Sequence, residues 1–479
     1  MRIAMAAAEA APFLKTGGLG DVMEALPIAL AEQKNMEICL FLPYYKTIKQ
    51  NENIPVEQIC EFTMDLGWRK SYVGLLKLKS PKRKLRVYFI DNNDYFWRDS
   101  VYGCVDDGER FAFYSKAVLE CMDRLDFRPE ILHCHDWQAS LVPIFYHSTF
   151  KDKFPGMKTV LTIHNLEYQG WAKQDFLGDV MGLGEEYRDV VTCGDSVNFL
   201  KTAIATADAV TTVSRTYAEE ITTPWFGQNL CVILQQEKAK LTGIVNGISM
   251  QRFDPATDPS LTVRFNADEY PEKKALAKEA LRKELGLETD TCAPILSIVS
   301  RLAGHKGIDI LCYIAETLMR DRDVQFVICG SGEAQYEKQL ASLAERYPGK
   351  CAAYIGFAPT LANRIYAASD IYLMPSRSEP CGLSQLIAMR YGAIPVVHTV
   401  GGLKDTVEPY NEVTGEGRGF TFQSYNGDDF LNAVDRACDL YWEKPADWIA
   451  LVQRNMRLDF SWKQPAQEYM NLYRSLLAE

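Results

Sequence analysis

Residues 2–22, RIAMAAAEAAPFLKTGGLGDV, set the pattern from which the rest of the chain can be interpreted. A short apolar run comes first and predicts a buried strand. A turn of small residues around a single lysine, Lys15, follows it. This order favours a tight connection from a strand to a helix, which is the repeating unit of parallel α/β sheets.

The same alternation of short β-rich runs and longer amphipathic segments continues along most of the chain. The expected strands of the first half are EICLFLP, LRVYFID, ILHCHD, TVLTIHN and AVTTVS, and those of the second half are ILSIVSR, VQFVICG, CAAYIGF, IYLMPS and IPVVH. Segments such as GIDILCYIAETLMRD have apolar residues three and four positions apart, as in helices that cover a sheet. The sequence therefore predicts an α/β fold with mainly parallel sheets.

The series of strands is interrupted between Asn246 and Thr291 by a polar, turn-rich segment. A chain of 479 residues is about three times the usual length of one domain, roughly 150 residues. We therefore expect one domain over residues 1–245, a second over residues 246–458 and a terminal amphipathic helix in residues 459–479. Ligands of open α/β sheets bind at the carboxyl ends of the strands, so we expect a site there.

Composition excludes several classes of function. The net charge of -11 argues against general affinity for nucleic acid or for an anionic membrane surface, because like charges repel. The 13 cysteines are scattered without a C-x-x-C pair, which is not typical of a disulfide framework. The N-terminal apolar run is interrupted by Glu9 and makes a poor secretory signal, and no run is long enough to span a membrane. A soluble cytoplasmic protein is the simplest interpretation.

The glycine-rich turn allows two interpretations. Backbone amides at a strand-to-helix turn can bind phosphate, and glycines let an anion approach closely. However, the spacing of Gly17, Gly18 and Gly20 does not complete the G-x-G-x-x-G fingerprint of dinucleotide-binding proteins. Taken alone, the turn is as compatible with an ordinary connection in which Lys15 is solvated.

Two basic residues follow the first expected strand of the second half. In SIVSRLAGHKGIDIL, Arg301 and Lys306 lie five positions apart just beyond the strand, where both could reach one diphosphate. Arginine binds phosphate through two parallel donors and lysine supplies a compact charge, so the pair could stabilise a leaving diphosphate. Solvated surface charges remain the alternative for both residues.

The segment PSRSEPCGLSQLIAMRYGAIPVV combines a strand end with the start of a helix near Ser384. Glu379 is placed to accept hydrogen bonds from sugar hydroxyls, and the amides that follow could attract a phosphate or a hydroxyl. Capping of the helix is the alternative role for Glu379. Cys381 is interpreted as a packed residue rather than a nucleophile, because no histidine lies nearby in the sequence.

Together, KTGGLGDV, ILHCHDWQASLVP, TIHNLEYQG, GIVNGISMQRFDPATDP, VSRLAGHKG and SRSEPCGLSQLIAMRYGAIPVV followed by GGLKDTV resemble the bacterial glycogen synthases and plant starch synthases. The motifs occur in the family's order from Lys15 to Val407. The resemblance implies a GT-B fold of two Rossmann-like domains facing across a cleft, with the C-terminal helix crossing back to the first domain. It also implies retaining transfer of glucose from ADP-glucose to the non-reducing end of an α-1,4-glucan, with no metal or cofactor.

The resemblance further implies roles for individual residues. The implied catalytic residues, which contact the transferred glucose or the leaving diphosphate, are His164, Arg301, Lys306 and Glu379. The implied substrate-binding residues are Lys15, Gly18, Asp21, Asp136, Trp137, Asn246, Phe357, Cys381, Gly382, Leu383 and Ser384. For Asp21 a helix cap is the alternative, and His133 with His135 could also suggest a metal pair, although no further ligands are evident.

The chain departs from the family pattern at three places. Phe357 stands where an aromatic residue, often tyrosine, is expected to stack on the nucleobase, and His305 stands where glutamine is expected. Residues 224–242 lack the usual glycine-rich run. The rival functions are a UDP-glucose-dependent enzyme of the same fold, a phosphorylase with a pyridoxal cofactor and an inactive glucan-binding paralogue.

Overall fold

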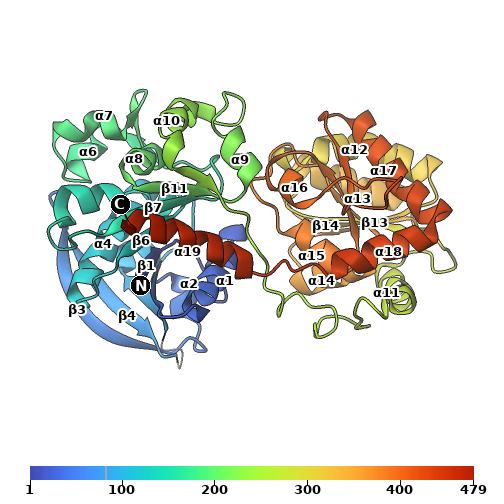
Figure 1. Ribbon diagram of the computed structural model, residues 1–479, viewed down its shortest axis with the longest axis horizontal. Helices are drawn as coiled ribbons and strands as arrows, with labels where there is room; N and C mark the ends of the chain where they lie inside the picture. The colour runs from blue at the N-terminus through green and yellow to red at the C-terminus, as the bar shows by residue number, and fades with distance from the viewer. Residues whose placement is uncertain (81–83, 479) are drawn as a thin grey trace. The chain divides into compact units, whose positions relative to one another are not determined.

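The computed structural model describes residues 1–80 and 84–478, which form two compact units (Figure 1). The N-terminal unit comprises Met1–Gly247 together with the segment that begins at Trp462, and the C-terminal unit comprises Ile248–Ser461. The boundary expected at Val245 lies two residues before this division. Among the described residues, no helix is both long enough and apolar enough to cross a membrane.

The N-terminal unit is built on a nine-stranded sheet with the order β12-β11-β7-β6-β1-β2-β5-β4-β3. Its strands are β1 (Arg2–Ala6), β2 (Glu37–Pro43), β3 (Val56–Leu66), β4 (Arg69–Leu78), β5 (Leu85–Asp91), β6 (Ile131–His135), β7 (Lys158–Ile163), β11 (Ala209–Thr212) and β12 (Leu241–Gly243). The pairs from β12 through β5 are parallel. The five strands expected in this half are confirmed as β2, β5, β6, β7 and β11.

One edge of this sheet differs from the parallel pattern that the sequence predicts. Strands β3 and β4 form an antiparallel hairpin, and β4 is also antiparallel to β5. The hairpin turns at Gly67, whose φ of +58° is a conformation that glycine adopts at little cost. An antiparallel edge on a mostly parallel sheet is common in doubly wound proteins, because an edge strand needs only one partner.

Helices cover the faces of this sheet. The longer ones are α1 (Gly18–Glu32), α4 (Asp107–Arg124) and α8 (Phe199–Thr206), and α2 (Lys46–Lys49), α3 (Asn93–Phe96), α5 (Val142–Phe145), α6 (Phe176–Asp179), α7 (Arg188–Val191), α9 (Arg215–Glu220) and α10 (Cys231–Gln236) are short. A separate small antiparallel sheet contains β8 (Trp171–Lys173), β9 (Thr192–Cys193) and β10 (Ser196–Asn198).

The final helix, α19 (Lys463–Ala478), belongs to the N-terminal unit although it follows the C-terminal unit in sequence (Figure 1). Its residues Ala466, Tyr469 and Tyr473 are fully buried in the same hydrophobic core as β1 and α1. This apolar face explains the amphipathic pattern that predicted a helix at the end of the chain.

The C-terminal unit has a six-stranded, wholly parallel sheet with the order β15-β14-β13-β16-β17-β18. Its strands are β13 (Ile295–Val299), β14 (Gln325–Gly330), β15 (Cys351–Ile355), β16 (Ile371–Met374), β17 (Ile394–His398) and β18 (Phe420–Phe422). Its helices are α11 (Tyr270–Leu285), α12 (Ile308–Asp321), α13 (Ala334–Arg346), α14 (Pro359–Ala368), α15 (Ser384–Arg390), α16 (Gly401–Thr406), α17 (Gly427–Glu443) and α18 (Pro445–Met456). The five strands expected here are confirmed as β13 to β17.

Each sheet contains a point at which the order of its strands reverses. In the N-terminal unit β2 to β5 lie on one side of β1, and the later strands β6, β7, β11 and β12 lie on its other side. In the C-terminal unit β13 and β16 are neighbours, with β14 and β17 on opposite sides of them. The loops after the two strands at such a point diverge and leave a crevice, which is where ligands of open α/β sheets bind.

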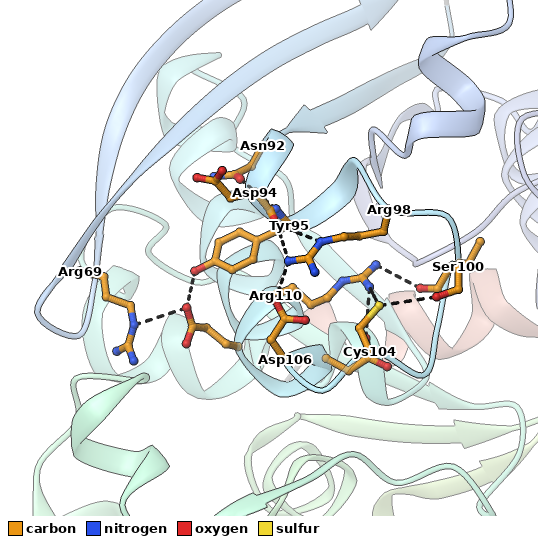
Figure 2. A network of polar contacts seen from close by, with 12 residues as sticks. Arg69, Asn92, Asp94, Tyr95, Arg98, Ser100, Cys104, Asp106 and Arg110 are labelled. Atoms are coloured by element: carbon orange, nitrogen blue, oxygen red, sulfur yellow. Dashed lines mark hydrogen bonds and ion pairs between the residues drawn. The ribbon is translucent and has the colours of Figure 1, made fainter.

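A buried arginine fixes the loop between α3 and α4 (Figure 2). Arg110 of α4 has no exposed side-chain surface. Its guanidinium donates to the Val101 carbonyl oxygen (3.1 Å), to Cys104 Sγ (3.2 Å) and to Asp107 Oδ1 (3.2 Å). These bonds pair both Nη atoms of the buried guanidinium and so tie the loop to the body of the unit, whereas Nε has no hydrogen-bond partner among the described residues.

We expect Arg110→Met to destabilise the N-terminal unit by about 3 kcal/mol, because it leaves the partly buried partners of the guanidinium unpaired while keeping a long apolar side chain. Urea-induced unfolding followed by tryptophan fluorescence measures the change. Arg98→Met is the matched control: Arg98 pairs with Asp106 from a side chain that is 36% exposed, so less than about 1 kcal/mol is expected. Equal losses in both variants would contradict the role of Arg110.

Candidate active site

The chemically reactive residues of the N-terminal unit follow three neighbouring strands, β7, β6 and β1. Glu9 and Lys15 come after β1, Asp136 comes directly after β6 and His164 directly after β7. Because the three strands are parallel, these residues lie at one edge of the sheet, at its reversal point. We call this group the N-terminal half-site.

The glycine-rich turn is held by two carboxylates. Lys15 Nζ lies 2.7 Å from Asp21 Oδ2, so the lysine that the sequence singled out is paired in this structure. Asp21 lies in the first turn of α1, and the residue that caps that helix, Gly17, makes no side-chain cap bond. Asp21 is therefore not the N-cap residue of α1, although its carboxylate lies in the first turn of that helix.

The second carboxylate, Glu9, was not identified from the sequence as a site residue. It is buried, and its Oε2 accepts a hydrogen bond from the Thr16 amide (2.6 Å). Burial raises the pKa of Glu9, and hydrogen bonds from Thr16, Gly20 and Gly17 oppose the rise. Several amides that could bind phosphate therefore already serve Glu9, and the Gly18 amide is not among them.

Asp136 has an unusual backbone conformation, with φ 57° and ψ -177°. Such a conformation costs a non-glycine residue about 1–3 kcal/mol and is found mostly where function requires it. Its Oδ1 accepts a hydrogen bond from the His164 amide (2.7 Å), so Asp136 fixes the loop after β7. Burial raises the pKa of the Asp136 carboxyl to about 7, against the effect of hydrogen bonds from the His164 and Asn165 amides.

Three histidines lie together beside Asp136. His133 and His135 of β6 are fully buried, and His164 is partly exposed. His135 Nδ1 lies 3.0 Å from His164 Nε2. Burial lowers the pKa of His133 and of His164 to about 3 and the pKa of His135 well below its ordinary value, so all three rings are neutral at pH 7.

The metal alternative for His133 and His135 does not fit their surroundings. Both ring nitrogens of His133 are taken by hydrogen bonds, from Nδ1 to the Tyr473 hydroxyl (2.7 Å) and from Nε2 to Thr162 Oγ1 (2.6 Å). Within residues 1–80 and 84–478, no group of three or more possible metal ligands occurs.

Trp137 and Asn246 have different environments. The Trp137 ring packs edge-to-face against Phe111, with 5.0 Å between the ring centroids, and is only partly exposed. A Cβ at Gly170 would approach this ring to 2.5 Å, so glycine is required there. The Asn246 side chain is buried, and its Oδ1 has no hydrogen-bond partner among the described residues.

Tyr102 is a further residue that sequence reasoning missed. It lies in the loop that Arg110 fixes. Burial raises the pKa of the Tyr102 hydroxyl strongly, the charges of Glu9 and Asp136 add to the rise, and a hydrogen bond with the Thr16 side chain opposes it. The hydroxyl therefore borders the glycine-rich turn. The only signal in the sequence is an aromatic residue in a polar loop, which is too common to be informative.

The C-terminal half-site is the group of residues in the loops after β13 and β16. At its centre Lys306 Nζ donates to Glu379 Oε2 (2.7 Å), and Ser376 Oγ donates to the same oxygen (3.0 Å). Only 6% of Glu379 is exposed. The two residues that the sequence assigned to the diphosphate and to the sugar are thus in direct contact, although 73 positions separate them.

The two loops of this half-site approach each other closely. The Arg377 amide donates to the His305 carbonyl oxygen (2.9 Å). A Cβ at Gly307 would lie 1.9 Å from the Pro375 carbonyl oxygen, and Gly307 has a φ of +77°, so no other residue fits there. The Arg301 guanidinium lies 3.3 Å from His305 Nε2 in an exposed position. The unexpected His305 therefore contacts one of the two predicted phosphate-binding cations.

The turn before α15 contains the other predicted sugar-binding residues, Cys381, Gly382, Leu383 and Ser384. Gly382 has a φ of +72° and Cys381 is buried, which agrees with a packed thiol. Ser384 is the first residue of α15, and its hydroxyl contacts Met374 Sδ (3.4 Å). Glu379 makes no cap bond to this helix, whose capping residue is Leu383. The capping alternative for Glu379 is therefore absent.

Phe357 lies after β15, in the same unit, with 84% of its surface exposed. An exposed aromatic ring at the carboxyl edge of a sheet can stack on a planar base. The C-terminal half-site thus offers two cations, a buried carboxylate and an exposed aromatic ring. This combination suits a sugar joined to a nucleoside diphosphate, and it places positive charge where a diphosphate would leave.

Comparison with known proteins gives a matching family for each unit. Residues 2–236 match the family of starch synthase catalytic domains, and residues 278–453 match glycosyl transferases group 1. The chain is 44% identical to the glycogen synthase of Exiguobacterium sibiricum over 99% of both chains. It is 45% identical to the glycogen synthase of Clostridium novyi, over 100% of this chain and 99% of the relative.

Solved structures agree with these matches. The catalytic domain of starch synthase IV from Arabidopsis thaliana, bound to ADP and acarbose, has a TM-score of 0.91 and 33% identity, covering 100% of this chain and 99% of that one. A sucrose-phosphate synthase from Thermosynechococcus elongatus has a TM-score of 0.61 at 18% identity, with the same coverage, and shares the fold.

We expect Asp136→Asn to change how stability depends on pH. Between about pH 4 and pH 7 Asp136 is ionised in the unfolded chain but protonated in the folded one, so its contribution to the free energy of unfolding falls as pH rises. Asparagine keeps the acceptor for the His164 amide but does not titrate. The stability of wild type relative to the variant should therefore decrease from pH 4 to pH 7 and then stay level.

Urea unfolding of both proteins at several pH values measures this difference. A difference that does not depend on pH, or that increases with pH, would show that the pKa of Asp136 is not raised.

Proposed function

Because the chain belongs to the family of bacterial glycogen synthases and plant starch synthases, which are glycosyltransferases with the GT-B fold, we propose that it transfers glucose from ADP-glucose to the non-reducing end of an α-1,4-glucan. The transfer retains the anomeric configuration and releases ADP. The observation that supports this proposal most strongly is the Lys306–Glu379 contact at the reversal point of the C-terminal sheet.

In this proposal each residue of the C-terminal half-site has one task. Lys306 and Arg301 bind the diphosphate and stabilise the charge that develops on it as ADP leaves. Glu379 accepts hydrogen bonds from hydroxyls of the donor glucose, and the Cys381, Gly382 and Leu383 amides near the start of α15 support the same sugar. Ser384 lies against a phosphate, and Phe357 stacks on the nucleobase.

The residues of the N-terminal half-site also have proposed tasks. Lys15 and the Gly18 amide bind the donor phosphates, and His164 forms a hydrogen bond with the transferred glucose. Asp21, Asp136, Trp137 and Asn246 contact the donor or the acceptor glucan. The acceptor hydroxyl attacks the anomeric carbon from the face that ADP leaves, and the departing phosphate takes its proton. A bound diphosphate has to compete with Asp21 for Lys15 and with Glu379 for Lys306.

Two finer points belong to the proposal. ADP is favoured over UDP as the donor nucleotide because the related starch synthase IV was solved with ADP. A cytoplasmic location is favoured because all thirteen cysteines lie among the described residues and each is a free thiol, as is usual in reducing compartments.

Nucleotide release from the purified protein tests the reaction. We expect ADP release from ADP-glucose in the presence of glycogen, with glucan growth in equal amount. Faster turnover with UDP-glucose would keep the chemistry and overturn the donor assignment. Absence of turnover with both donors would favour the inactive glucan-binding paralogue.

We expect Lys306→Ala to lower kcat by about 100-fold or more, since it removes a charge that stabilises the leaving diphosphate. The matched control is Lys283→Ala, which breaks an exposed ion pair with Glu279 on α11 and should leave kcat unchanged. Because loss of Lys306 leaves a buried carboxylate without its cation, urea unfolding is measured alongside. A folded Lys306→Ala enzyme with kcat within threefold of wild type would refute the diphosphate role.

A further inference from the structure

The carboxyl edge of the N-terminal sheet contains a stack of imidazole rings. The centroids of His133 and His135 are 4.1 Å apart, and those of His135 and His164 are 5.3 Å apart, with interplanar angles of 34° and 35°. His133 and His135 alternate along β6 and share a face, and His164 follows the neighbouring strand β7. Of the three residues, only His164 is partly exposed.

The hydrogen bond between His135 and His164 can be donated by either ring. Both rings are neutral at pH 7 because burial lowers the pKa of each. The 3.0 Å contact joins His135 Nδ1 to His164 Nε2, so one of these nitrogens carries the hydrogen and the other accepts it. The choice fixes the tautomer of both rings, and therefore which nitrogen of His164 is left protonated toward solvent.

The surroundings of His135 distinguish the two arrangements. Its Nε2 is buried and has no hydrogen-bond partner among the described residues. If His164 donated, the hydrogen of His135 would sit on Nε2, as a buried N–H without an acceptor. If His135 donates from Nδ1, only a lone pair is left unpaired at Nε2. Orphaned buried N–H groups are rarer than under-satisfied acceptors, so the second arrangement is favoured.

We propose that His135 is a positioning residue, which holds His164 as the tautomer protonated on Nδ1 so that this nitrogen donates a hydrogen bond to a hydroxyl of the substrate sugar. The ligand of His164 rests on the function proposed above. The tautomer itself depends only on contacts within the N-terminal unit. His164 Nε2 has its partner in His135, which leaves Nδ1 as the nitrogen available to a ligand.

A chain of hydrogen bonds behind His135 fixes the ring stacked on it. Tyr473 of α19 is fully buried, and its hydroxyl has one partner among the described residues, His133 Nδ1 (2.7 Å). The hydroxyl therefore donates to Nδ1, and His133 donates from Nε2 to Thr162 Oγ1 (2.6 Å). Thr162 in turn contacts Thr211 Oγ1 (2.6 Å). The C-terminal helix thus sets the tautomer of His133 and supports the stack.

The nitrogen NMR signals of ¹⁵N-histidine-labelled full-length protein test the tautomer directly. The chain has six histidines, so the spectrum is simple enough to assign by single substitutions. We expect both His135 and His164 to be protonated on Nδ1 at pH 7. A His164 ring protonated on Nε2 would overturn the proposal.

Two variants of nearly equal size separate positioning from packing. Asparagine at position 135 offers an N–H close to the place of Nδ1, whereas leucine offers none. We expect His135→Leu to lower kcat about tenfold with little change in KM, as for the loss of one hydrogen bond. His135→Asn should stay within about threefold of wild type. The ¹⁵N signal of His164 Nε2 should keep the position of a hydrogen-bonded acceptor in His135→Asn and shift to that of an unpaired lone pair in His135→Leu.

Equal loss of activity in both folded variants, or a His164 Nε2 signal that does not change in His135→Leu, would contradict the positioning role. A wild-type protein that shows the expected tautomer but no glucosyl transfer would instead contradict the proposed function. The NMR and kinetic results therefore separate the two failures.

Discussion

Parallel strand pairing around a reversal of strand order is the constraint on which the rest of the structure depends. Because β7, β6 and β1 run in the same direction, every chain segment that leaves them does so at one edge. The same holds for β13 and β16 in the C-terminal unit. Residues far apart in sequence, such as Lys306 and Glu379, therefore meet without any local signal that they will do so.

At the carboxyl edge of each sheet, polar groups are paired with other groups of the same edge. Lys15 forms an ion pair with Asp21, Lys306 forms one with Glu379, and several amides of the glycine-rich turn donate hydrogen bonds to Glu9. A chain with a net charge of -11 attracts an anionic donor only through such local cations. In the proposed function, these carboxylates hold the cations in place and a donor phosphate would displace them. Removing one partner of a buried ion pair is costly because the other charge is left unpaired. A lysine is therefore expected to exchange its carboxylate for a phosphate rather than to remain without an anion.

Much of the fold could be predicted from sequence because each strand is a local apolar run. EICLFLP became β2 and IPVVH became β17 with their expected bounds. The β3–β4 hairpin was missed because VEQICEFTMDL, whose exposed and buried residues alternate, was not among the apolar runs. Such alternation is the pattern of a strand with one solvated face. The C-terminal helix was expected from its amphipathic pattern.

The site was predictable only in part. Arg301 and Lys306 stand out because two cations follow a strand, and Glu379 because a carboxylate precedes a helix. Glu9 and Tyr102 do not stand out, and His135 stood out only as one of a possible metal pair, since the roles of all three arise from contacts with other segments of the unit.

The direct test of the diphosphate role of Lys306 is a crystal structure with ADP. If Lys306 binds the diphosphate, its Nζ should lie within about 3 Å of a phosphate oxygen in that structure. An ADP whose phosphates are bound elsewhere while Lys306 stays on Glu379 would contradict that role.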